Sequence, residues 1–229
     1  MTTSAKSMRG QPLTTRLLLA CGMIGPLLFV VVFLLEGATR PNYSPWHHFV
    51  SSLSQGEQGW MQIINFLVCG VLMLCFAIGL RRVFREGKGS TWGPILLGIF
   101  GLALITAGLF VTDPILGYPP GAASEGTLHN AIHNGASVVV FYISLPAACF
   151  VLARRFARDP AWRGWTFSTI AAGVLVIVFI SAAVVATIID LNGTFPGTPV
   201  GLFQRLSIIT GWSWIALFAL RLMRREKAV

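Results

Sequence analysis

Six long runs of apolar residues, separated by short polar segments, form the main pattern along the chain. They lie near residues 17–35, 60–80, 92–112, 134–153, 166–189 and 202–220. An α-helix needs about 20 mostly apolar residues to cross the hydrocarbon core of a bilayer, and each run is about that long. The pattern predicts an all-α fold in which a single integral membrane domain forms a bundle of six transmembrane helices.

Composition and charge agree with a membrane protein. Of the 229 residues, 55% are hydrophobic and 11% are charged, whereas about 25% of the residues in an average soluble domain are charged. The formal net charge is +9, but the basic residues form small clusters beside the apolar runs, as juxtamembrane anchors do. We expect membrane lipids as partners and no nucleic acid, and the short loops leave no room for a separate soluble domain.

The basic residues also predict the orientation of the bundle. Of the 17 lysines and arginines, all except Arg40 and Arg205 lie in the terminal segments or in the segments after the second and fourth runs. By the positive-inside rule, these segments and both termini are cytoplasmic. The segments after the first, third and fifth runs then face outward, in a multi-pass protein of the cell membrane.

Charged side chains recur at the outward ends of the runs. The first, third and fifth runs end near Glu36, Asp113 and Asp190. A carboxylate at a helix C-terminus is disfavoured by a few tenths to about 1 kcal/mol, so each acid needs a partner. We expect one outward polar layer, either a functional site or a structural belt of ion pairs. The basic side chains available to these acids are Arg40, His47, His48, His129, His133 and Arg205.

Two of the histidines have the spacing of metal ligands. His129 and His133 are four residues apart, which places them on one face of a helix that starts the fourth run. With a third ligand from Asp113, His47 or His48, they would hold zinc or another divalent metal. A zinc-protease motif requires a glutamate directly after the first histidine, and Asn130 occupies that position. We therefore exclude a zinc protease.

The first outward segment contains a cluster of serines and histidines. Ser44 followed by Pro45 predicts the start of a short interfacial helix near residues 45–55, because serine caps helices and proline favours their first position. Ser51 and Ser54 would lie on the polar side of that helix. Ser51 is a candidate nucleophile, although no Gly-x-Ser-x-Gly motif surrounds it. The alternative is that both serines cap or pack.

Several short motifs recur together: Glu36-Gly37 with Arg40-Pro41, the run from Trp46 to Ser54, Asp113-Pro114, His129, and Gln204-Arg205. They resemble an uncharacterised family of mainly prokaryotic polytopic membrane proteins, catalogued as domain of unknown function 998. The resemblance covers nearly the whole chain. It implies a multi-helix bundle in a prokaryotic plasma membrane and supplies no reaction.

The motifs and the polar layer together select the candidate site residues. The candidates for catalysis are Glu36, Ser51, Asp113 and His129; those for substrate binding are Arg40, His48, Ser54, Asp190 and Arg205; those for a metal are Asp113, His129 and His133.

These residues favour a membrane-embedded hydrolase or binding protein for a lipid-type substrate. One alternative is a transporter for a small solute or coupled to protons, although the inner halves of the runs hold almost no ionisable residue to carry a charge across. The other alternative is a non-catalytic membrane scaffold or sensor, in which histidines would respond to acid.

The orientation can be tested by labelling single cysteines in a cysteine-free background. We expect residues 42, 125 and 192 to react with a membrane-impermeant maleimide added from outside, because the segments that contain them lack the basic clusters that stay in the cytoplasm. Reaction of residue 125 only from the cytoplasmic side would reverse the predicted orientation.

Overall fold

The computed structural model describes residues 12–225. It contains the helices α1 (Leu13–Thr39), α2 (Gly59–Val83), α3 (Trp92–Leu109), α4 (Leu128–Val138), α5 (Leu145–Phe156), α6 (Trp165–Leu191) and α7 (Val200–Arg225). A π-helical turn, η2 (Val139–Ser144), joins α4 and α5 into one continuous helix. Six helices in the described part are long and apolar enough to cross a membrane, so the predicted all-α, multi-pass fold is confirmed.

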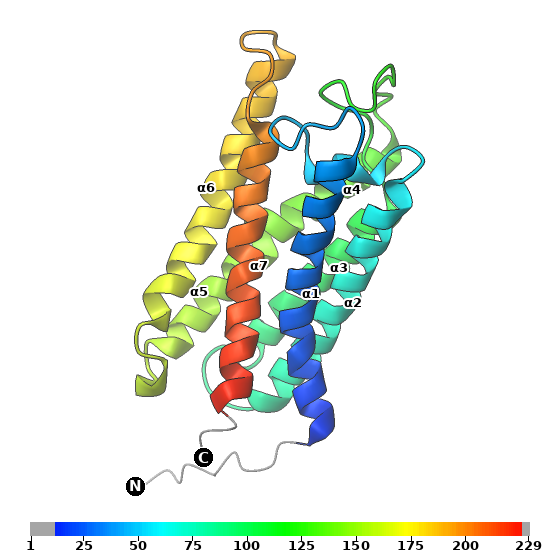
Figure 1. The fold of residues 1–229 in the computed structure, drawn as a ribbon. Helices are drawn as coiled ribbons and strands as arrows, with labels where there is room; N and C mark the ends of the chain where they lie inside the picture. The colour runs from blue at the N-terminus through cyan, green and yellow to red at the C-terminus, as the bar shows by residue number, and fades with distance from the viewer. Residues whose placement is uncertain (1–11, 226–229) are drawn as a thin grey trace, which may run out of the picture.

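The six spanning helices form a closed ring. Each spanning helix packs against the next one along the chain, and α7 returns to pack against α1. Figure 1 shows that α1 begins and α7 ends at the same end of the bundle. The segments 40–58, 110–127 and 192–199 lie at the opposite end, which we call the distal end. The alternation of helix direction agrees with the predicted topology, while the side that faces the cytoplasm stays a prediction.

Aromatic side chains fill the centre of the ring. Trp212 of α7 is fully buried, and its ring lies 5.6 Å from Phe29, 4.8 Å from Phe100 and 6.0 Å from Phe141, measured between ring centroids. The outer surfaces of the helices carry many exposed large apolar side chains. A bundle that is apolar inside and outside is expected where lipid replaces water as the solvent.

Glycines allow α2 and α3 to approach closely. A Cβ atom added to Gly101 of α3 would lie 2.8 Å from the carbonyl oxygen of Gly70 of α2 and 3.1 Å from the Cβ of Met73. Small residues at such contacts let two helix backbones pack directly against each other. Gly70 and Gly101 therefore form part of the packing face between α2 and α3.

The helix boundaries and the first distal segment differ from the sequence prediction. Most helices extend a few residues beyond the predicted runs, whereas α3 ends at Leu109 rather than near residue 112. The helix predicted near residues 45–55 is shorter than expected: its helical part is a 3-10 helix, η1 (Val50–Ser54). All five of its residues are buried in the bundle instead of lying along the membrane surface.

The glycine contact predicts how a single methyl group affects stability. We expect Gly101→Ala to destabilise the bundle by about 1–3 kcal/mol, because the added Cβ has no space beside the backbone of α2. The matched control is Gly98→Ala on the same helix, where the nearest atom lies 3.7 Å from the added Cβ. Melting temperatures in nanodiscs should fall for Gly101→Ala only. An equal effect of both substitutions would show that the loss arises elsewhere.

Candidate functional site

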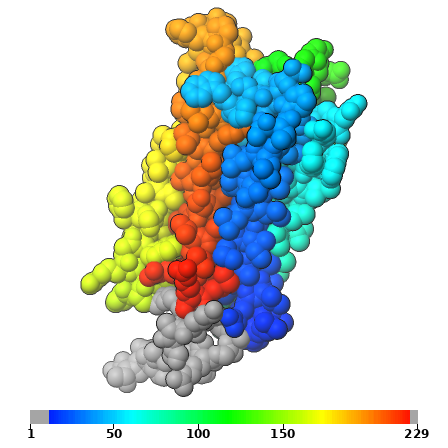
Figure 2. All heavy atoms as spheres, viewed as in Figure 1, coloured from blue at the N-terminus to red at the C-terminus, as the bar shows by residue number. Residues whose placement is uncertain are grey.

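The distal segment between α1 and α2, residues 40–58, is folded into the end of the bundle. Its 3-10 helix η1 is buried, and Figure 2 shows the segment lying over the distal ends of α1 and α7. Backbone N–H and C=O groups that are removed from water need hydrogen-bond partners. Two arginines, Arg40 and Arg205, supply donors to the carbonyl groups of this segment.

Arg205 on α7 fastens the first half of the segment. Its Nη1 donates to the carbonyl oxygens of Pro45 (2.6 Å) and His48 (3.1 Å), and its Nη2 donates to the hydroxyl of Tyr43 (2.5 Å). The side chain is buried, and no carboxylate within residues 12–225 forms an ion pair with it. Burial raises the pKa of Tyr43 to about 12, so the phenol stays neutral. The predicted pairing of Arg205 with an acid is therefore replaced by bonds to neutral oxygens.

The first turns of α7 provide further bonds to the same segment. The backbone N–H of Leu202 donates to the carbonyl oxygen of Trp46 (3.0 Å), and the Oε1 of Gln204 accepts from the N–H of Val50 (2.6 Å). Free N–H groups are available there because the first turn of a helix has no internal acceptors for them. Gly201 lets the segment come close, since a Cβ at that position would lie 2.3 Å from a carbonyl oxygen.

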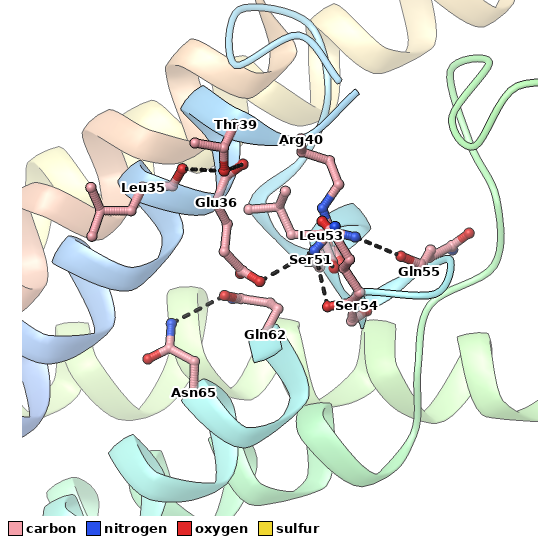
Figure 3. A network of polar contacts seen from close by, with 11 residues as sticks. Leu35, Glu36, Thr39, Arg40, Ser51, Leu53, Ser54, Gln55, Gln62 and Asn65 are labelled. Atoms are coloured by element: carbon pink, nitrogen blue, oxygen red, sulfur yellow. Dashed lines mark hydrogen bonds and ion pairs between the residues drawn. The ribbon is translucent and has the colours of Figure 1, made fainter. Parts of the chain in front are cut away.

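Arg40 fastens the second half of the segment. Its guanidinium donates to the carbonyl oxygens of Leu53, Gln55 and Gln58, each at 3.1 Å, and it forms an ion pair with Glu36 at 3.2 Å. Figure 3 shows this network between the end of α1 and η1. Both ionic side chains are buried. Glu36 and Arg40 therefore pair as expected, and the pair supports the fold of the segment.

Two amide side chains of α2 lie below this ion pair. The Nδ2 of Asn65 donates to the Oε1 of Gln62 and to the carbonyl oxygen of Phe29, both at 3.1 Å, as Figure 3 shows for the two amides. The Oε2 of Glu36, the Nε2 of Gln62 and the Oδ1 of Asn65 are buried without a hydrogen-bond partner in the described part. Polar groups thus extend from the distal end into the α1–α2 interface.

Asp113 fixes the start of α4. Its carboxylate accepts from the hydroxyl (2.6 Å) and the backbone N–H (2.8 Å) of Thr127, which is the N-cap residue of α4. These bonds hold the pKa of Asp113 below its ordinary value. The Oδ1 of Asn130 accepts from the N–H of Asp113 (3.2 Å) and the hydroxyl of Thr112 (3.1 Å). Asp113 is thus held by hydrogen bonds and not by one of the arginines.

Asp190 forms a separate group at the end of α6. Its Oδ2 accepts from the backbone N–H (2.8 Å) and the hydroxyl (3.0 Å) of Thr198, and it lies 3.7 Å from the Nδ1 of His47. The same Nδ1 lies 3.0 Å from the carbonyl oxygen of Thr198. The expected contact between Asp190 and a histidine is present, and it links the segment 192–199 to the first distal segment.

His133 of α4 contacts two carbonyl groups at the C-terminal end of α3, where the helix no longer supplies N–H donors to them. Its Nδ1 lies 3.0 Å from the carbonyl oxygen of Ala107 and 2.9 Å from that of Phe110. In a continued helix, residue 114 would donate to Phe110, but Pro114 has no N–H. Because both neighbours of Nδ1 are acceptors, Nδ1 carries the proton, and the neutral ring keeps a lone pair on Nε2.

A cavity of about 250 Å³ lies at the distal end between α4, η2, α6 and the buried segment. Its apolar lining includes Phe49, Phe141, Ile180 and Val184, and its polar lining includes Ser51, Asp113, Asn130, His133 and Gln204. A smaller space of about 20 Å³ adjoins it and reaches Trp212; Ser51, His133 and Gln204 line both spaces. The cavity is thus mainly apolar with a few convergent polar groups, as ligand sites in proteins are.

The π-helical turn η2 shapes one wall of this cavity. Pro146 follows the turn and lacks the N–H that would bond to the carbonyl of Tyr142 in an α-helix. The hydroxyl of Ser144 donates to the carbonyl oxygen of Val139, five residues earlier (2.8 Å). Phe141 and Tyr142 of the turn line the cavity. Single π-helical turns are frequent at functional sites.

The structure separates the predicted site residues into two groups. Ser51, Asp113 and His133 line the cavity. The others lie outside its lining, so the residues of the expected outward polar layer do not all line one cavity. Arg40, Arg205 and Glu36 are engaged in fastening the first distal segment. The residues outside the lining of the cavity are Glu36, Arg40, His48, Ser54, His129, Asp190 and Arg205.

The predicted metal ligands are not assembled into a site. His129 is exposed, with its ring 5.3 Å from that of Phe110, whereas His133 is buried and bonded to carbonyl groups of α3. Asp113 is bonded to Thr127. Within residues 12–225, no group of three or more histidine, cysteine, aspartate or glutamate side chains is placed to hold a metal ion. The spacing of four residues predicts that His129 and His133 lie on one face of a helix, but it does not predict how deeply each side chain is buried.

Several polar residues of the cavity were missed as site residues from the sequence. Asn130 and Gln204 line the cavity together with Ser137, which lies one turn below His133. Asn130 and Ser137 could have been found from the sequence, because they belong to a series of polar residues at helical spacing at the start of the fourth run: Asn130, His133, Asn134 and Ser137. Gln204 carries no such signal, because its place depends on how α7 meets the first distal segment.

Comparison with known proteins gives one match. The family model described as "Protein of unknown function (DUF998)" matches residues 23–221, which is most of the chain. Neither the curated proteins nor the solved structures contain a match to this sequence.

The surroundings of His48 predict a dependence of stability on pH. Burial, the neighbouring His47 and the charge of Arg205 hold the pKa of His48 below its ordinary value, against an opposing hydrogen bond with the backbone of Leu116. Below about pH 6.5 the unfolded chain therefore binds a proton that the folded protein does not bind, and stability falls as the pH falls. The slope for one such proton is at most about 1.4 kcal/mol per pH unit.

Melting temperatures between pH 7.5 and 5.5 check this expectation. His48→Asn is the informative variant, because an amide oxygen can still accept from the N–H of Ser44, as the Nδ1 of His48 does at 2.9 Å. The drop in melting temperature on acidification should be smaller in the variant than in the wild type. The same drop in both proteins would assign the acid sensitivity to other groups.

Proposed function

We propose, for a chain that belongs to the DUF998 family of membrane proteins, that the distal cavity binds a lipid-type amphiphile. The head group of the ligand would contact Ser51, Asn130, His133 and Gln204, and its apolar chain would leave the cavity between η2 and α6. The observation that carries the proposal is a mainly apolar cavity with convergent polar groups, set into a bundle that is surrounded by lipid.

The size of the cavity fits part of an amphiphile. Its volume of about 250 Å³ is slightly below the range of about 300–1,000 Å³ that is typical of pockets enclosing a drug-sized ligand. A head group and the first part of a chain fit such a volume. The rest of an acyl or alkyl chain would lie along the surface of the bundle, among the lipids.

The rim of the cavity supports a lateral opening to lipid. Val138, Tyr142 and Val184 line the cavity and are also 48%, 37% and 45% exposed on the outer surface of the bundle. They belong to α4, η2 and α6, so the seam between these helices is the route. The hydroxyls of Tyr142 and Ser181 are hydrogen-bonded across this seam (3.1 Å).

The chemistry of the polar lining suits recognition of a hydroxyl, amide or amine. Neutral His133 offers the lone pair of Nε2, and the amide nitrogen of Gln204 is available as a donor because its Oε1 is bonded to Val50. The aromatic core around Trp212 closes the inner end of the cavity. A cavity that is closed toward the other side of the membrane favours binding over transport.

Photo-crosslinking in phosphatidylcholine nanodiscs tests the proposal. Dodecanol carrying a diazirine on the part of its chain that would pass between η2 and α6 should form adducts in the peptides that contain Val138–Tyr142 and Ile180–Val184. Ser137→Leu should lower the adduct yield severalfold, because the larger side chain fills the cavity. The matched control is Ser168→Leu on the exposed surface of α6, which should retain the wild-type yield.

The outcomes of this experiment are distinct. Equal labelling of both variants, or labelling spread evenly over the lipid-facing surface, would contradict a specific cavity site. If an ester analogue of the probe were cleaved by the wild type and left intact by Ser51→Ala, the cavity would be a hydrolase site, with Ser51 as nucleophile and His133 as base, instead of a binding site.

A further inference from the structure

The charges around the cavity select the head group of its ligand, an inference that rests on the proposed function. Asp113 is the only carboxylate in the described lining, and no lysine or arginine lines the cavity. His133 contributes a lone pair in its neutral form. The lining thus brings one negative charge and no permanent positive charge to the ligand.

Asp113 is ionised at neutral pH. The two bonds from Thr127, at 2.6 and 2.8 Å, stabilise the carboxylate and hold its pKa below the ordinary value. Each carboxylate oxygen accepts one of these bonds, and the backbone of Gly126 is a further partner of the carboxylate. A carboxylate has about four acceptor positions, so one remains for another donor. Asp113 is 8% exposed as a residue, and its carboxylate is bonded to neutral donors and not to a cation.

Neither Arg40 nor Arg205 lines the cavity, and neither forms an ion pair with Asp113 in the described part of the chain. Arg40 is paired with Glu36 and bonded to carbonyl groups of the first distal segment. Arg205 uses its donors on carbonyl oxygens and on Tyr43. His129 interacts electrostatically with Asp113, but it is exposed and lies outside the lining of the cavity.

We propose that the cavity selects amphiphiles with an ammonium head group and disfavours those with a phosphate head group. An ammonium group donates hydrogen bonds through each of its protons, and two residues that line the cavity, Asp113 and His133, carry acceptors for them. A phosphate would meet a carboxylate without a cation to separate them, and like charges in contact are strongly unfavourable. A neutral hydroxyl head group should bind more weakly than an ammonium group and more strongly than a phosphate.

The test compares three probes of equal chain length on the wild-type protein in phosphatidylcholine nanodiscs at pH 7.5. Dodecylamine, dodecanol and dodecyl phosphate each compete with the diazirine probe, and empty nanodiscs correct for partition into lipid. We expect dodecylamine to compete at least about tenfold more strongly than dodecyl phosphate, with dodecanol between them. The wild-type ranking needs no variant and decides the inference by itself.

Two matched variants assign the selectivity to one carboxylate. Asp113→Asn keeps an oxygen that can accept from Thr127, and it should remove the advantage of dodecylamine over dodecanol. Asp190→Asn changes the other aspartate at the distal end, which lies outside the lining of the cavity, and it should retain the wild-type ranking.

The possible failures separate the two proposals. Equal competition by all three probes, or stronger competition by dodecyl phosphate, would overturn the selection of head group and leave the binding site standing. Unchanged selectivity in Asp113→Asn, or its loss in Asp190→Asn, would overturn the role of Asp113. No competition by any probe at all would overturn the proposed function itself.

Discussion

The buried first distal segment depends on one constraint: its backbone carbonyl groups, once removed from water and lipid, must receive hydrogen bonds. Arg205 and Arg40 meet this demand from opposite sides, one from α7 and one from the end of α1. Both guanidinium groups are buried. Irregular backbone is tolerated inside a membrane bundle only where protein groups satisfy it. The two arginines therefore explain how a short 3-10 helix can be buried at the distal end of the bundle.

The cavity is a consequence of that arrangement. The buried segment contributes Phe49 and Ser51 to its lining, and the start of α7 contributes Gln204, which also bonds to the segment. The opposite walls come from places where helices are interrupted: the end of α3 before Pro114, and the π-helical turn before Pro146. Each interruption frees backbone groups or shifts side chains. Together they leave a space that six regular helices would close.

The charged side chains at the distal end form two sets: one set stabilises the fold, and the other lines the cavity. Buried Arg40 and Arg205 donate hydrogen bonds to carbonyl groups; Arg40 also pairs with Glu36, and Arg205 also donates to Tyr43. Asp113 instead is stabilised by neutral donors, and it lines the cavity as the one carboxylate among the described lining residues. Taken together, the acids and bases at the distal end suggest that their charges balance. The charges that line the cavity do not balance, because among the described residues Asp113 lines it and no lysine or arginine does. This local imbalance, rather than the total charge, sets the preference for a head group.

The sequence by itself determined the membrane class, the number of spans and the end at which the polar residues gather, because hydrophobic length and charge clusters act locally along the chain. It also indicated Ser51, Asp113 and His133 as candidate site residues, and all three line the cavity. Tertiary structure alone decided that residues 50–55 are buried, that Arg205 binds carbonyl oxygens and that Gln204 reaches the cavity. It likewise separated His129 from His133 by depth, although their spacing is that of metal ligands. Hydrogen-bond partners and burial depend on which helices meet, and that information is not contained in the spacing of residues within one helix.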